Sequence, residues 1–189
     1  VLAGIDAAQA AGFRRIKLNS VILRGRNDDE VLPLVAFCRE RDLDLAFIEE
    51  MPLGHIDEHD RAATFVSSEE IRRRIGERYQ LLSAADDTGG PSRYYRMPDS
   101  SIRVGFISPH SHNFCASCNR VRVTAEGRLL LCLGNEHSVD LRGILRAYPD
   151  DDGPVRQAIL EALPRKPERH YFQLDEEPSI VRFMNMTGG

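Results

Sequence analysis

Three of the four cysteines of this chain lie close together in the sequence. Cys115, Cys118 and Cys132 follow the pattern C-x2-C-x13-C within the segment CASCNRVRVTAEGRLLLC. Two cysteines separated by two residues can bind one metal centre from a single turn, and the third can return to that centre from further along the chain. A chain of 189 residues with four cysteines is not typical of a disulfide framework, so the pattern indicates metal binding.

The residues between the second and third of these cysteines predict a β-hairpin. The segment Ala125–Gly127 suits a three-residue loop with glycine at the left-handed position. This loop predicts three cross-strand pairs, which are Thr124 with Arg128, Arg122 with Leu130, and Arg120 with Cys132. Because directly paired residues share a face of the ribbon, as do residues two apart, Arg120, Arg122 and Cys132 are expected on one side.

These arginines give the hairpin a local positive charge. Between Ser100 and Ala125 the chain has no Asp or Glu, and Arg103 precedes Arg120 and Arg122 there. A guanidinium group matches phosphate or carboxylate with two parallel hydrogen bonds. The pattern therefore predicts an anionic small molecule held beside the metal, and a solvated basic strand face is the simpler alternative.

The residues leave the identity of the metal open. Structural zinc sites use four protein ligands, and His137 could supply the fourth, with His110 and His112 as further candidates. A [4Fe–4S] cluster normally binds four cysteines, so three would leave one iron with an open position for a substrate atom. Composition alone favours zinc, because mixed Cys/His zinc sites are common.

The elements that must position these residues begin with an α/β pattern. The sequence before Pro52 predicts a helix ending near Gly12, a strand over Arg15–Leu23, a helix over Asp28–Arg41 opened by a capping box of Asn27 and Glu30, and a strand over Leu43–Glu50. Strands joined through a helix are expected to be parallel neighbours. Lys17 and Asn19 share the face opposite the apolar side chains of the first strand, and Cys38 falls in the apolar stripe of the second helix.

After residue 60 the pattern changes to short strands and helices. It predicts a helix capped by Ser67 and Glu70 with Ile71 and Ile75 facing inward, a loop over Asp86–Ser92, strands over Arg93–Arg96 and Ile102–Ile107, and helices over Ser138–Ala147 and Pro154–Leu163. The chain is therefore divided into an α/β part over residues 1–60 and a mixed α+β part over residues 61–189.

Composition restricts the class of protein. Hydrophobic residues make up 42% and charged residues 29%, as in ordinary globular proteins, and no apolar run is long enough to cross a membrane. The net charge of −4 argues against general nucleic-acid binding. Residue 1 is Val and the first residues already follow a helical stripe, so we expect the C-terminal part of a longer protein. Membrane, secreted, fibrous and disordered proteins are not expected.

The cysteine segment resembles the C-terminal cluster motif of the GTP 3′,8-cyclase family, the radical-SAM enzymes that open molybdenum cofactor biosynthesis. The likeness extends to IKLNSVILRGRNDDEV, FIEEMPLG, PSRYYRMPD and the terminal Thr-Gly-Gly, and it covers nearly the whole chain. The family's N-terminal C-x3-C-x2-C motif, which binds the cluster that cleaves S-adenosylmethionine, is absent here. The resemblance implies the end of an incomplete (β/α) radical-SAM barrel, followed by a smaller mixed α+β domain carrying an iron–sulfur cluster.

The resemblance also implies roles for particular residues. Cys115, Cys118 and Cys132 resemble the three ligands of a second [4Fe–4S] cluster, whose open iron meets the guanine of GTP. The residues that match GTP-contacting positions are Lys17, Arg120, the backbone at Val121, and Arg122. Met51 matches a position beside S-adenosylmethionine, and the terminal Gly188 and Gly189 resemble a catalytic tail that threads into the active site. Ala46 departs from the family pattern, which often has arginine there, so no role is carried over to it.

The activity implied by the resemblance is the cyclisation of GTP to 3′,8-cyclo-7,8-dihydroguanosine 5′-triphosphate. In the family an adenosyl radical removes hydrogen from C3′ of GTP, and the sugar radical attacks C8 of guanine. The resemblance implies a cytoplasmic enzyme without nucleic-acid or membrane partners, followed in its pathway by cyclic pyranopterin monophosphate synthase, and it is compatible with a homodimer. We expect these 189 residues alone to be inactive. The alternative from the residues is a zinc-stapled, non-catalytic binding module.

Overall fold

A computed structural model describes residues 1–56, 59–86, 89–176 and 180–187 of the chain. It contains two units, one formed by Val1–Glu50 with Ala62–Asn113 and the other by Met51–Arg61 with Phe114–Gly189. This division differs from the boundary expected near residue 60. The reason is that residues 62–113 supply strands that pair with the first sheet, so they belong to the first unit.

The first unit is built on a mixed five-stranded sheet with the order β1-β2-β5-β4-β3. The strands are β1 Lys17–Val21, β2 Asp44–Ile48, β3 Leu82–Ser83, β4 Arg93–Arg96 and β5 Arg103–Ile107. Strands β1 and β2 are parallel, as predicted, and β5 continues the parallel pairing on the other side of β2. Strands β4 and β3 extend this sheet in the antiparallel sense.

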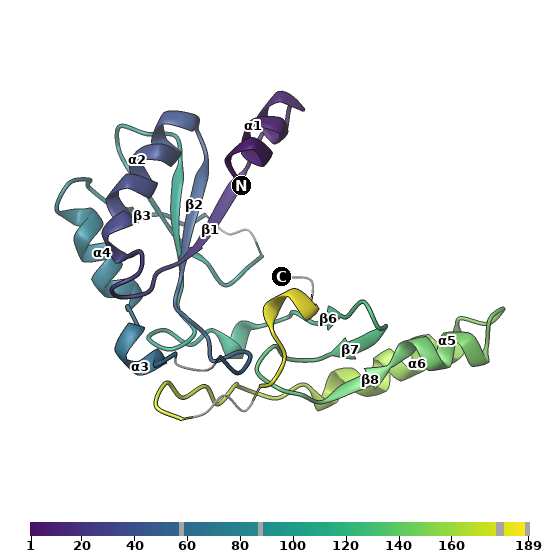
Figure 1. Ribbon diagram of the computed structural model, residues 1–189. Helices are drawn as coiled ribbons and strands as arrows, with labels where there is room; N and C mark the ends of the chain where they lie inside the picture. Colours follow the sequence, from purple (N-terminus) through teal and green to yellow (C-terminus); the bar gives the residue numbers. More distant parts are fainter. Residues whose placement is uncertain (57–58, 87–88, 177–179, 188–189) are drawn as a thin grey trace. The chain divides into compact units, whose positions relative to one another are not determined.

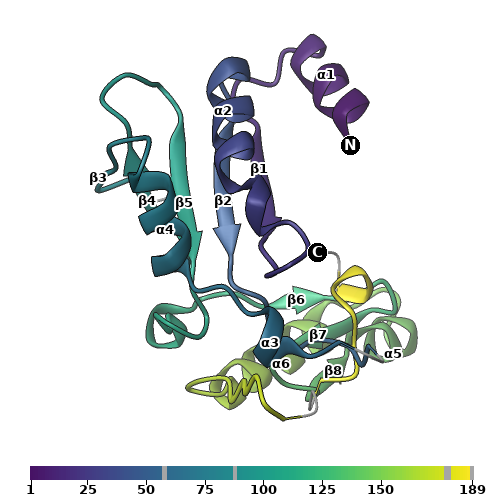
Figure 2. The ribbon, with the colours of Figure 1, turned by 60° about the vertical axis from the view of Figure 1, so that its left-hand side comes forward.

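Helices cover one face of this sheet (Figure 1 and Figure 2). The helical elements of the unit are α1 Leu2–Ala10, the 3-10 turn η1 Asp28–Glu30, α2 Val31–Arg41 and α4 Ser68–Gly76, with the short α3 Arg61–Thr64 at the boundary between the units. Leu45 and Phe47 of β2 are fully buried beneath the helices, together with Ile71 and Ile75 of α4. Cys38 is fully buried in the same core, which confirms its structural role.

The start of α2 differs from the prediction. Asn27 does not cap the helix: its Oδ1 accepts a hydrogen bond from Leu23 N at 2.7 Å, and its Nδ2 donates to Val21 O at 3.0 Å. The Asn27 side chain therefore satisfies backbone groups at the end of β1, and the helix begins later, after η1. The predicted cap of α4 is confirmed, because Ser67 Oγ accepts from Glu70 N at 3.2 Å.

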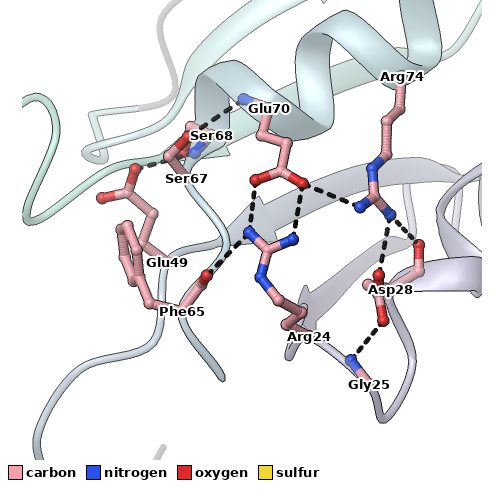
Figure 3. A network of polar contacts seen from close by, with 9 residues as sticks. All are labelled: Arg24, Gly25, Asp28, Glu49, Phe65, Ser67, Ser68, Glu70 and Arg74. Carbon is pink, nitrogen blue, oxygen red and sulfur yellow. Dashed lines mark hydrogen bonds and ion pairs between the residues drawn. The ribbon is translucent and has the colours of Figure 1, made fainter. Parts of the chain in front are cut away.

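A network of ion pairs connects the turn after β1 with α4 (Figure 3). The Glu70 carboxylate accepts hydrogen bonds from Arg24 Nη2 at 2.7 Å and from Arg74 Nη2 at 2.9 Å. Arg74 also donates to Asp28, whose Oδ1 accepts from Gly25 N at 2.6 Å. The hydrogen bond and charge of Arg24 lower the pKa of Glu70, and Arg74 lowers it further. The network therefore ties the loop between β1 and α2 to the neighbouring helix.

The second unit contains a three-stranded antiparallel sheet in the order β6-β7-β8, with two helices beside it (Figure 1). Its elements are η2 Cys115–Ser117, β6 Arg122–Val123, β7 Arg128–Leu130, β8 Ser138–Asp140, α5 Leu141–Ala147, α6 Gly153–Ala162, η3 Leu163–Arg165 and η4 Met184–Thr187. Residues 138–140 form a strand rather than the predicted start of a helix, because they pair with β7. Asp140 then caps α5 by accepting from Gly143 N at 2.9 Å.

In the parts of the chain that the structure describes, no helix combines the length and apolar character that a transmembrane span requires.

Candidate functional site

The hairpin that carries the predicted site has the expected register near its loop. Arg122 pairs with Leu130, Thr124 N donates to Arg128 O at 2.9 Å, and Gly127 has the left-handed φ of 76°. The predicted pairing of Arg120 with Cys132 is wrong, because β6 begins only at Arg122.

A side chain from outside the hairpin fills the place of that third pair. Lys166 Nζ donates to Arg120 O at 3.0 Å and to Leu131 O at 2.6 Å. Both carbonyl oxygens are therefore satisfied by one ammonium group instead of by direct strand pairing. The two cysteine-bearing segments are thus connected through Lys166.

The three cysteine sulfurs of this unit all accept hydrogen bonds from the backbone. His170 N donates to Cys115 Sγ at 3.4 Å. Cys118 receives a backbone hydrogen bond from Arg120, and Cys132 receives one from Gly134. All three side chains are only partly buried and none forms a disulfide. Hydrogen bonds of this kind stabilise the negative charge of thiolates and are a feature of iron–sulfur sites.

The thiols also influence one another electrostatically. Burial raises the pKa of Cys132, and repulsion from Cys115 and Cys118 adds to the increase, against the hydrogen bond from Gly134 and the charge of Lys166. For Cys118 burial acts in the same direction, but the hydrogen bonds from Arg120 and the charge of Lys166 outweigh it, so its pKa is lowered. The three thiols are therefore near enough to influence one another electrostatically, and the positive charge of Lys166 acts on Cys118 and Cys132.

Among the described residues, the histidines considered as zinc ligands are not grouped with the cysteines around a single metal ion. His137 is exposed, and its backbone N–H donates to Asn135 Oδ1 at 2.7 Å. His110 and His112 belong to the first unit, where His110 Nε2 lies 2.9 Å from Glu50 O. Over residues 1–56, 59–86, 89–176 and 180–187, no group of three His, Cys, Asp or Glu side chains is arranged to hold a single metal ion.

Two guanidinium groups accompany the thiols. Arg120 is exposed, with its guanidinium 5.3 Å from the centroid of the Phe114 ring. Arg122 is half-buried and donates to Thr187 O at 3.4 Å. Burial lowers the pKa of Arg122, and repulsion from Arg120 adds to this effect. An anion placed between the two groups would remove that repulsion, and Val121, the residue between them in the sequence, is exposed.

The C-terminal segment reaches the same arginine. Thr187, the last described residue, is buried and its carbonyl oxygen is the acceptor for Arg122. Gly188 and Gly189, which we expect to be catalytic, lie outside the described residues.

Lys17 lies in the first unit, on the sheet face opposite the helices. Lys17 Nζ donates to Tyr94 Oη at 3.4 Å, and Lys17 pairs in register with Asp44, which forms a partly buried ion pair with Arg103. The Arg103 guanidinium lies over the Tyr94 ring. The expectation that Lys17 and Asn19 share a face opposite the apolar side chains agrees with the alternating burial of β1.

Two further positions were singled out in the sequence. Ala46 lies within β2, and Met51 follows that strand. Ala46 is fully buried and pairs with Gly105, where an added Cβ would lie 2.2 Å from Ser92 Oγ. There is therefore little free space at Gly105, the residue that pairs with Ala46 in the sheet. Met51 follows β2, belongs to the second unit, and accepts a hydrogen bond through its carbonyl from Leu53 N at 2.8 Å.

No sequence pattern pointed to Lys166, His170 or Gly134 as part of the site. The segment KPERH contains Lys166 and His170 and follows the last long helix, but no residue spacing links it to the cysteines. Its role depends on contacts between segments far apart in the sequence, so only the folded chain shows it.

Together, the fold and the site define an α/β protein with a cysteine site beside a positively charged hairpin. The chain belongs to the Molybdenum Cofactor Synthesis C family, whose model matches residues 43–172. Over 189 residues it is 62% identical to a GTP 3′,8-cyclase of Ectopseudomonas mendocina and 60% identical to one of Marinobacter nauticus. The GTP 3′,8-cyclase of Pseudomonas entomophila is 60% identical over 190 residues. Each alignment covers 100% of this chain, which spans 57% of the length of these relatives.

Proposed function

We propose that this chain is the GTP-binding part of a GTP 3′,8-cyclase, acting in the first step of molybdenum cofactor biosynthesis. The three relatives described above are named GTP 3′,8-cyclase, and each of them aligns with the whole of this chain. The proposed reaction is the radical S-adenosylmethionine cyclisation of GTP to 3′,8-cyclo-7,8-dihydroguanosine 5′-triphosphate. In this proposal the first unit is the end of an incomplete (β/α) barrel, and the second unit binds the cluster and the nucleotide.

The cysteine site is the observation that carries the proposal. Cys115, Cys118 and Cys132 would hold a second [4Fe–4S] cluster, and the backbone hydrogen bond at each sulfur suits a thiolate ligand. When bound, this cluster supplies an iron with an open coordination position for the guanine base. The protein's part is to orient the nucleotide, since the cofactors carry the difficult chemistry.

Positive side chains would bind the rest of the nucleotide. Arg120 and Arg122 repel each other at the cluster site, so binding of an anionic group of GTP removes an unfavourable interaction. We assign the backbone at Val121 to the same contact, and Lys17 to a second contact from the first unit. Since Ala46 has no polar side chain, any contact that relatives make with arginine there is missing or comes from another residue.

Two further assignments follow from the family. Met51 is assigned a position beside S-adenosylmethionine, and Gly188 with Gly189 a catalytic tail. The approach of Thr187 to Arg122 supports the second assignment, because it brings the end of the chain to the proposed nucleotide contact. A homodimer and transfer of the product to cyclic pyranopterin monophosphate synthase complete the proposal. The sequence has no cysteines for the cluster that cleaves S-adenosylmethionine, so these 189 residues alone should form no cyclised product.

Anaerobic reconstitution followed by GTP titration tests the proposal. The chain should bind about four iron and four sulfide ions, as one [4Fe–4S] cluster requires. Arg122→Ala should weaken GTP binding roughly 10–150-fold, which corresponds to losing a charge-assisted hydrogen bond of about 1.5–3 kcal/mol. Arg156→Ala is the matched control, because it removes an exposed arginine of the same unit from α6.

Two results would contradict the proposal. A colourless chain that takes up stoichiometric zinc and no iron after reconstitution would indicate the zinc-stapled module instead. Equal GTP affinity for the Arg122→Ala and Arg156→Ala chains would remove the nucleotide role from the hairpin.

A further inference from the structure

The segment Lys166–Phe172 lies outside the hairpin and contacts the chain segments that bear the cysteines. It follows η3, and none of its residues was singled out by the sequence patterns. Its first residue, Lys166, is partly buried and connects Arg120 O with Leu131 O, at 3.0 and 2.6 Å. Each acceptor is close in sequence to a cluster cysteine, since Arg120 follows Cys118 by two residues and Leu131 directly precedes Cys132. One ammonium group therefore sets the separation of two ligand segments.

The other end of the segment contacts the third ligand. His170 N donates to Cys115 Sγ at 3.4 Å, and Phe172 N donates to His170 Nδ1 at 3.3 Å. The His170 and Phe172 rings stack with their centroids 4.1 Å apart. The Cβ of His170 and the ring of Phe172 pack closely on Gly134, where an added Cβ would lie 2.7 Å from His170 Cβ and 2.9 Å from the Phe172 ring.

These contacts join the segment to all three ligands. Lys166 acts through the backbone next to Cys118 and Cys132, while His170 donates directly to Cys115. Gly134 donates to Cys132, so its packing against His170 and Phe172 connects the same segment to that sulfur a second time. The segment therefore contacts each part of the chain that bears a ligand.

We propose that Lys166 and His170 are positioning residues of the cluster site, and that the segment Lys166–Phe172 fixes the spacing and polarity of the three thiolates. This inference rests on the proposed [4Fe–4S] cluster. Each cysteine of such a cluster binds a different iron, so the separation of the ligand segments must match the size of the cluster. Lys166 holds that separation, and its charge stabilises the anionic cluster.

Two measurable consequences follow for a chain that lacks the Lys166 ammonium group. The loss of a group that orients ligands typically weakens metal binding roughly 10–100-fold, so the cluster should be lost faster by about that factor. The reduction potential should become more negative, because a nearby positive charge favours the reduced and more negative cluster. A residue that merely stabilises the fold would not move the potential.

The experiment compares three substitutions in the reconstituted 189-residue chain. Lys166→Met keeps the length of the side chain without its charge, and Lys166→Arg keeps the charge and the hydrogen-bond donors. Arg165→Met is the control, since it removes the same charge from an exposed neighbouring residue. The measurements are iron content, the rate of cluster loss to a chelator, the reduction potential, and thermal unfolding of the metal-free chain.

We expect Lys166→Met alone to lose the cluster faster and to shift the potential, with Lys166→Arg close to the unsubstituted chain. The inference is overturned if Lys166→Met and Arg165→Met give the same potential and rate of loss. It is also overturned if Lys166→Met unfolds the metal-free chain, which would make Lys166 a folding residue. If the unsubstituted chain binds no iron, the proposed function itself fails, and this inference fails with it.

Discussion

Glu49 offers a quantitative test of how the first unit holds the turn after β5. The side chain is fully buried and its carboxylate accepts four hydrogen bonds. Oε1 accepts from Ser68 N at 2.9 Å and from Ser111 Oγ, and Oε2 accepts from His110 N and Ser111 N, both at 3.0 Å. The carboxylate also lies at the N-terminal end of α4, where negative charge is favourable (Figure 3).

The donors around this carboxylate set the size of the effect. In Glu49→Gln the amide NH2 is best placed at the Oε1 position, because Ser111 Oγ can turn to accept from it. Only Ser68 N then loses its acceptor, and loss of one hydrogen bond to a charged group costs about 2 kcal/mol. In Glu49→Ala all four donors lose an acceptor that is itself a buried charge, so we expect a loss of about 4 kcal/mol in the free energy of unfolding.

Urea unfolding of the metal-free chain measures both losses. Hydrogen exchange of the Leu45 and Phe47 amides adds a readout specific to β2. Glu40→Gln is the control, because it removes an exposed carboxylate from α2 and should change the unfolding free energy by less than about 0.5 kcal/mol. If Glu49→Ala and Glu40→Gln destabilise the chain equally, the hydrogen bonds at Glu49 do not stabilise the turn.

Two further predictions concern pH and thiol reactivity. Because ion pairing lowers the pKa of Glu70 in the folded chain, its contribution is present above the unfolded pKa of about 4.3 and is lost as the pH falls through the folded value. In acid titrations of stability, Glu70→Gln should cost roughly 1 kcal/mol at pH 7 and little at pH 2, and an equal cost at both would refute the ion-pair argument. Burial, with a smaller contribution from Asp44, raises the pKa of Cys38 from an ordinary value of 9.0 to about 11, so its thiolate fraction at pH 8 should be about 100-fold lower than that of an unperturbed thiol. Mass mapping of alkylation should find Cys38 slow to react in the folded chain and fast in urea, and rapid reaction in the folded chain would contradict its burial.

Local patterns predicted most elements of the fold. The alternation of side chains identified β1 and its polar and apolar faces, the pattern before Pro52 also gave β2 as its parallel neighbour, and the helical spacing of apolar residues placed Cys38, Ile71 and Ile75 in the core. These features depend on neighbours within a few residues, so the sequence specifies them directly. The predicted capping by Asn27 failed because its side chain bonds to the end of β1 instead.

The division into units could not be predicted from local patterns. Strand β5 was expected, but its pairing with β2 is a contact between distant segments, and this pairing assigns residues 62–113 to the first unit. In the same way, residues 138–140 follow a helical pattern locally and become a strand because β7 offers a partner.

The sequence by itself determined the three cysteines, the two arginines and the tight loop that sets the register between Arg122 and Leu130. Only the tertiary structure decided what lies beyond that register, where Lys166 enters between the two chain segments and His170 reaches Cys115. The physical reason is that backbone groups left without a strand partner must still form hydrogen bonds, and their donor can come from any part of the chain that packing brings near.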